Sequence, residues 1–174
     1  MVLTEILETT MISNEDILTI SQNILSTMLQ LDAIPCELSP SDKRSDGITG
    51  CIQISGEWQG AVVIQCSEEL ARTFASRLFE EIHDDINEAD LRDAFAELTN
   101  MIGGNIKSQV PCPTFLSIPT VTTGQNFDFH LSSASVIRDL ALACDGETLR
   151  IIMYEEDRMQ TNRLALRKLD TISN

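Results

Sequence analysis

One stretch in the middle of the chain has the period of an amphipathic helix, and the rest of the sequence must fold around it. Between Asp90 and Lys107, apolar side chains recur at about 100° per residue and therefore gather on one side. Such a side needs partners in a core, so the pattern predicts a long helix packed on other elements. The apolar positions are Leu91, Ala94, Phe95, Leu98, Met101, Ile102 and Ile106.

The other side of this helix combines a carboxylate, an amide and glycine. Glu97 and Asn100 are at i and i+3, so their side chains are neighbours, and Gly104 follows one turn later with Gly103 next to it. Glycine inside a helix costs roughly 1 kcal/mol relative to alanine, and it leaves a smooth spot where another backbone can approach. We expect a docking surface here. Two other interpretations stay open: a solvated polar face, and a helix that packs closely on a neighbouring helix or strand.

The same residues resemble a known pattern. They are similar to the active helix of the CheC/CheX/FliY family of chemotaxis phosphatases, and most of all to the CheX branch, which carries one such helix instead of two. A second block, Pro119 to Gly124, resembles the family's Pro-x-x-x-x-Gly entry to a strand, although the interval from Asn100 to Pro119 is shorter here than in the family pattern. The helix pattern reads Asp93-x3-Glu97-x2-Asn100, continued by Met101-Ile102-Gly103-Gly104-Asn105.

The resemblance implies a hydrolase that accelerates loss of phosphate from the phospho-aspartate of a CheY-type response regulator. That acyl phosphate is already reactive and bound to Mg²⁺ in the receiver domain, so a helper must supply an oriented water for in-line attack. Asn100 is expected to position the water, since a carboxamide has both a donor and an acceptor. Glu97 is expected to pair with a receiver lysine. Asp93, Gly103 and Gly104 are expected to help docking, although an acid early in a helix also favours the helix dipole.

Two functions without catalysis stay open. One is an interaction module that binds a receiver or a flagellar-switch protein, and the other is a dimerising structural domain whose acidic face is only surface. An intact Glu97 and Asn100 pair favours catalysis over both. The resemblance also implies a homodimer joined through its sheets. It implies no cofactor or metal in this chain, since the Mg²⁺ is bound by the receiver domain.

Charge and cysteine content exclude several other classes. A net charge of −15 argues against nucleic acid and against an anionic membrane surface as partners. The five cysteines lack a CxxC pair, which favours reduced core residues of a cytoplasmic protein over disulfides or a metal site. His83 and His130 are isolated from any cysteine cluster, which argues against a zinc site. No stretch approaches the roughly 18 apolar residues of a membrane span, and the N-terminus lacks the features of a secretory signal.

The 174 residues suit one CheX-like domain of the α+β class. The pattern predicts a sandwich of two helix-plus-three-strand units with an added helix between them and a largely antiparallel sheet. Residues 1–12 are an arm or a helix extension, and residues 155–174 a short helix or a tail. Glycines at 50 and 60 inside strands indicate bulges or close backbone packing. Three helices are predicted to start at the caps Ser13, Ser67 and Asn87, and the first is predicted to stop at Pro35. A turn is predicted at 124–126. The predicted strands are 36–38, 48–54, 58–66, 119–123, 127–131, 134–143 and 148–154.

Overall fold

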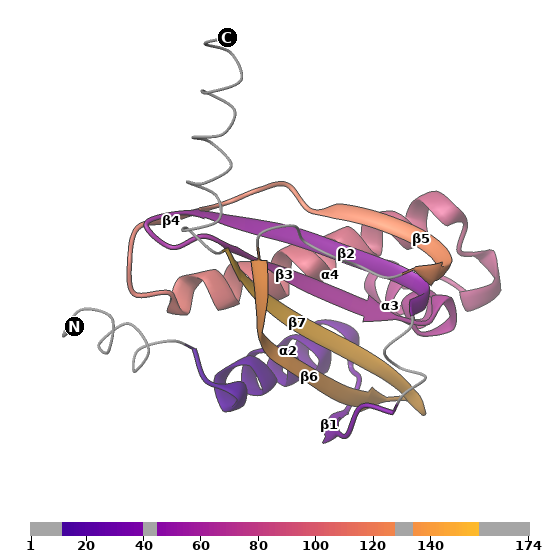
Figure 1. Ribbon diagram of the computed structural model, residues 1–174. Coiled ribbons are helices and arrows are strands. Elements are labelled where there is room, and N and C mark those ends of the chain that lie inside the picture. Colours follow the sequence, from indigo (N-terminus) through magenta and orange to yellow (C-terminus); the bar gives the residue numbers. More distant parts are fainter. Residues whose placement is uncertain (1–11, 40–44, 128–133, 157–174) are drawn as a thin grey trace, which may run out of the picture.

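The structure is a computed structural model that describes residues 12–39, 45–127 and 134–156, and Figure 1 shows it as a ribbon. Its described residues form three α-helices, one short 3-10 helix and seven strands, which confirms the predicted α+β class. The order is α2 (Asn14–Leu29), β1 (Ala33–Cys36), β2 (Ser45–Gly56), β3 (Gly60–Cys66), α3 (Glu68–Phe79), η1 (His83–Asp85), α4 (Glu88–Gln109), β4 (Thr114–Leu116), β5 (Thr120–Phe127), β6 (Ala134–Cys144) and β7 (Glu147–Glu156).

The seven strands make one sheet in the order β1-β6-β7-β3-β2-β4, and β5 also pairs with β2. Every described pairing is antiparallel, as the sequence predicted. The hairpin from β6 to β7 turns at Asp145 and Gly146, which both have positive φ. One face of the sheet packs against α2, α3 and α4 in a single large core, while a small apolar cluster of Ala61, Val63, Ile152 and Tyr154 lies on the other face.

The three predicted helix caps are confirmed. Ser13 and Asp16 form a reciprocal capping box, in which each side chain accepts a hydrogen bond from the other residue's backbone N–H. The hydrogen bonds from Ser13 hold the pKa of the Asp16 carboxyl below its usual value. Ser67 caps α3 by accepting from the backbone N–H of Leu70, and Asn87 caps α4.

Several predicted boundaries were wrong. The first helix does not run to Pro35: it closes at Gln30, which adopts the left-handed conformation and donates its N–H to the carbonyl of Leu25. Pro35 instead lies in β1, at the edge of the sheet, where a missing N–H is tolerated. The predicted strand at 36–38 is therefore the short β1 at Ala33–Cys36. Strand β4 was not predicted at all.

The predicted turn at 124–126 is also absent, because β5 continues through it to Phe127, with a shift in the pairing register between Ser45 and Gly47 of β2. Pairing with β2 continues along this stretch, with Gly47 opposite Gly124 and Ser45 opposite Phe127, and this ladder overrides the local turn signal. The remainder of the predicted strand at 127–131, His130, and most of the predicted arm (1–12) and extension (155–174) lie outside the described residues.

Candidate functional site: the exposed face of α4

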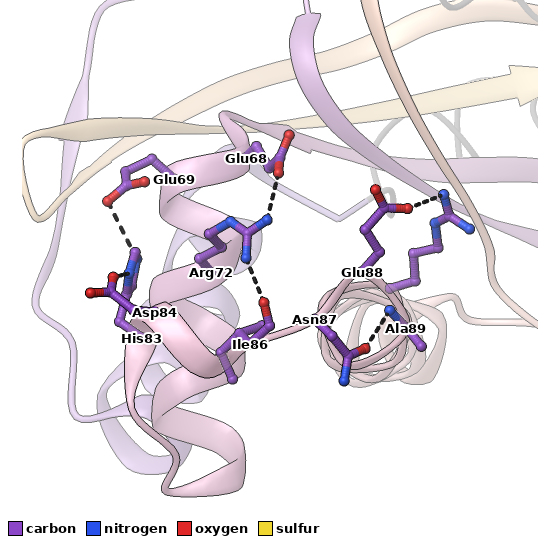
Figure 2. A network of polar contacts seen from close by, with 10 residues as sticks. Glu68, Glu69, Arg72, His83, Asp84, Ile86, Asn87, Glu88 and Ala89 are labelled. Atoms are coloured by element: carbon purple, nitrogen blue, oxygen red, sulfur yellow. Dashed lines mark hydrogen bonds and ion pairs between the residues drawn. The ribbon is translucent and has the colours of Figure 1, made fainter.

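The start of α4 is fixed by polar contacts with α3 and η1. Asn87 Oδ1 accepts hydrogen bonds from the backbone N–H groups of Ala89 (2.8 Å) and Asp90 (3.1 Å). Just before it, the carbonyl of Ile86 accepts a hydrogen bond of 2.6 Å from Arg72 of α3, as Figure 2 shows. Because the N-terminal end is held to α3, the register of every later residue along α4 is defined relative to the rest of the fold.

The exposed face of α4 carries the residues predicted to act. Asp93, Glu97 and Asn100 are all exposed, and Gly104 is half-buried on the same face. Among the described residues, neither the Glu97 nor the Asn100 side chain makes a hydrogen bond or an ion pair, so both are available to a partner molecule. In the described part of the chain, a Cβ at Gly104 meets only Leu116 of β4 within 4 Å, at 3.8 Å. The structure thus brings together a carboxylate, an amide and a low, smooth surface over three turns of one helix.

Gly103 corrects the sequence interpretation. It is buried toward the sheet, where a Cβ would lie 2.4 Å from Ile52 Cγ2 of β2. Its missing side chain therefore lets the helix approach the sheet, and the prediction that it faces a partner is wrong. The helical period alone places it at the boundary of the buried face, where only the packing decides.

A second glycine makes the reciprocal contact from the sheet. Gly50 of β2 leaves room for α4, because a Cβ there would lie 2.0 Å from Thr99 Oγ1 and 3.2 Å from Phe95 Cε1. Thr99 turns its hydroxyl back to the carbonyl of Phe95, at 2.7 Å. The close contacts at Gly50 and Gly103 therefore hold α4 against the sheet both before and after Asn100 in the sequence. The glycine inside a strand pattern was the only sequence signal for this contact, and the predicted close packing at Gly50 is confirmed.

The cysteines take no part in this face. Burial raises the pKa of Cys51 to about 11 and that of Cys144 to about 12, and it also raises the pKa of Cys66. These thiols therefore stay protonated near neutral pH and are poor nucleophiles and metal ligands. Cys51, Cys66, Cys112 and Cys144 are free thiols, and Cys36 is exposed on β1 and is not a core residue as predicted. In residues 12–39, 45–127 and 134–156 no three His, Cys, Asp or Glu side chains are grouped so as to hold a metal ion.

Comparison with protein families matches the model of chemotaxis phosphatase CheX to residues 48–142, which is more than half of the chain. The chain belongs to the CheX family. The matched span contains the whole of α4 and the strands around it, so the resemblance read from the helix pattern is confirmed. No curated relative matches the chain.

Solved structures show the same CheX-like fold. A CheX chemotaxis protein from Vibrio vulnificus has a TM-score of 0.70 at 23% identity, and the match covers 82% of this chain and 95% of that one. The structure of a CheX-CheY-BeF3-Mg complex from Borrelia burgdorferi gives 0.63 at 20% identity, covering 82% and 96%. FliY from Thermotoga maritima gives 0.57 at 12% identity, covering 83% and 91%.

No helix within the described residues is long and apolar enough to cross a membrane.

Proposed function

We propose that this chain is a phosphatase for the phospho-aspartate of a CheY-type response regulator, acting in the cytoplasm in chemotaxis or related two-component signalling. The observation that carries the proposal is a pair of exposed polar side chains, Glu97 and Asn100, that make no hydrogen bond or ion pair with any described residue and lie on a helix packed tightly on the sheet. Membership of the CheX family supports it, as does the structure of the CheX-CheY-BeF3-Mg complex from Borrelia burgdorferi.

The chemistry asks little of this chain. The acyl phosphate of a receiver needs an attacking water in line with the leaving carboxylate oxygen, and the receiver's own Mg²⁺ neutralises the phosphoryl charge. Asn100 accepts a hydrogen bond from that water through Oδ1 and donates through Nδ2 to a phosphoryl oxygen, which fixes the water in place. Water attacks phosphorus, the phosphorus–oxygen bond to the aspartate breaks, the aspartate leaves as a carboxylate, and the inorganic phosphate carries both protons of the water.

Glu97 acts in docking. Its carboxylate lies one turn before Asn100 and pairs with a lysine of the receiver near the phosphoryl group, a charge-assisted contact that fixes the orientation of the two proteins. Asp93 extends this acidic row by a further turn, and Gly104 lets the receiver backbone come close to the helix. The function needs no cofactor or metal of the chain's own.

The test is the decay of phosphorylated receivers from the same organism in Mg²⁺, with and without the protein. We expect faster decay, which Asn100→Ala abolishes at every protein concentration and which Glu97→Ala weakens through binding. Asn105→Ala is the matched control, because Asn105 is an exposed amide of the same helix whose side chain bonds its own helix at the Met101 carbonyl, at 2.8 Å. Equal loss of activity in Asn100→Ala and Asn105→Ala would overturn the assignment.

A non-catalytic binding module is the second candidate. It predicts that receivers bind without faster decay and that Asn100→Ala leaves the decay rate unchanged. We further propose that the protein is a homodimer, as the CheX resemblance implies. Sedimentation mass measures the dimer separately from activity, since both functions permit it.

A further inference from the structure

The edge of the sheet beside α4 contains a β-bulge. Strand β4 pairs with residues 54–56 of β2, and β5 pairs with residues 45–51. Between these two ladders β2 has only residues 52 and 53, whereas the edge chain has residues 117–119. One extra residue is therefore accommodated where β4 passes into β5, and Figure 1 shows this connection running along the outer side of β2.

Ser117 builds the bulge. Its backbone N–H donates to the carbonyl of Gln53 at 2.9 Å, while the N–H of Gln53 donates to the Ser117 hydroxyl at 2.9 Å instead of to a backbone carbonyl. The hydroxyl in turn donates to the carbonyl of Ile118 at 3.0 Å. Pro119 follows, which has no N–H to continue the ladder. The result is an isoleucine, Ile118, held at the sheet edge with 88% of its surface exposed.

The bulge lies level with the candidate site. Ile52, the β2 residue that the bulge passes, is the residue that contacts Gly103, three positions after Asn100. Leu116, at the end of β4, is the residue nearest to a Cβ on Gly104. The bulge is therefore beside the turn of α4 that runs from Asn100 to Gly104.

We propose that this bulge, with Ile118 at its tip, is a second contact for the receiver domain that docks on the exposed face of α4. The inference rests on the proposed function and deepens it. Specific protein interfaces use roughly 20–30 residues on each side. The exposed face of α4 offers Asp93, Glu97, Asn100 and Gly104, so most of the contact must come from elements beside the helix.

Both flanks of α4 carry exposed apolar residues, but they lie beside different turns of the helix. On the side of α3 and η1, Ile82 is 70% exposed near the start of α4, next to ion pairs such as Arg72 with Glu68 at 2.9 Å. Figure 2 shows this network of polar contacts. The bulge lies beside the turn from Asn100 to Gly104. Interface centres are depleted of charge and rely on buried apolar anchors. The bulge supplies such an anchor in Ile118, 88% exposed at the sheet edge. The matching patch on the receiver is apolar and lies beside its phosphorylation site.

The experiment compares Ile118→Ser with Ile34→Ser. Both isoleucines are exposed on edge elements of the same sheet, Ile34 at 67%, but Ile34 lies on β1 at the opposite edge. Turnover is measured with a receiver from the same organism, held phosphorylated by a small phosphodonor in Mg²⁺, over a range of receiver concentrations. Affinity is measured for the same receiver carrying beryllium fluoride and Mg²⁺. Sedimentation gives the mass of each variant.

We expect Ile118→Ser to raise KM and weaken receiver affinity by roughly ten-fold, with kcat kept at saturating receiver, while Ile34→Ser behaves as the unchanged protein. Unchanged KM and affinity in Ile118→Ser would overturn the contact and leave the proposed function standing. Loss of the dimer in Ile118→Ser with unchanged KM would also overturn it, in favour of a second copy of the chain as the occupant. Absence of both binding and faster decay with the unchanged protein would overturn the proposed function itself.

Discussion

The adjacent glycines of α4 give a matched pair of substitutions with different expected effects on stability. Replacing either glycine by alanine removes the penalty of glycine in a helix, a gain of about 1 kcal/mol. The space around the new methyl group differs. At Gly104 it lies 3.8 Å from Leu116 Cδ2, which is ordinary contact, whereas at Gly103 it lies 2.4 Å from Ile52 Cγ2.

Ile52 has little freedom to move away. It is β-branched, lies in the central part of β2 and is fully buried, with 0% of its surface exposed. Overpacking of this kind typically costs about 1–3 kcal/mol. Gly104→Ala should therefore raise the free energy of unfolding by about 1 kcal/mol. The free energy of unfolding of Gly103→Ala should be about 1–3 kcal/mol lower than that of Gly104→Ala. Relative to the unchanged protein, the stability of Gly103→Ala therefore ranges from nearly unchanged to clearly reduced.

Urea unfolding followed by circular dichroism, at one fixed protein concentration, measures the difference from the midpoint and slope of each curve. A double-mutant cycle with Ile52→Ala identifies the cause. Ile52→Ala alone should lower the free energy of unfolding by about 2–5 kcal/mol. The loss should be smaller in the Gly103→Ala background, because the new methyl group fills part of the same space. Equal stabilisation by the two alanines, or purely additive effects in the cycle, would refute the tight contact between Gly103 and Ile52.

Three further outcomes are expected from urea unfolding. Gly50→Ala should lower the free energy of unfolding by about 1–3 kcal/mol, because its Cβ would meet Thr99 Oγ1 at 2.0 Å. Asn87→Ala should lower it by about 1 kcal/mol through loss of the cap of α4. The pKa of Asp16 is lowered by the hydrogen bonds from Ser13, so its stabilising effect is complete above the unfolded pKa and disappears as the pH falls through the folded pKa. Asp16→Ala should therefore be less stable than the unchanged protein at neutral pH, and the two should converge in acid.

Much of the fold was predictable because its signals are local. The caps Ser13, Ser67 and Asn87 set the starts of the helices through bonds that span only two or three residues. The turn at Asp145 and Gly146 fixes the last hairpin in the same way. The exposure of Glu97 and Asn100 followed from the helical period, because the apolar side of α4 must pack on the core and the opposite side then faces outward.

The errors come from contacts between distant parts of the chain. Gly124 looks like a turn residue until its partner on β2, Gly47, is known. Gly103 was assigned to the partner face because the sequence pairs it with Gly104, and only Ile52, about fifty residues earlier, shows that it faces inward. The bulge at Ile118 depends on the registers of β4 and β5 against β2, which no local pattern contains.

The same long-range contacts explain how a site this simple can act. In the proposed function Asn100 holds a water, and the rate depends on how closely its position is fixed relative to the docked partner. The two glycine contacts, Gly50 with Thr99 and Gly103 with Ile52, fix the helix against β2 on both sides of that residue. The bulge that carries Ile118 is built on the same strand. Strand β2 therefore positions both the proposed catalytic amide and the proposed second contact, and a receiver bound to both would be oriented against one rigid frame.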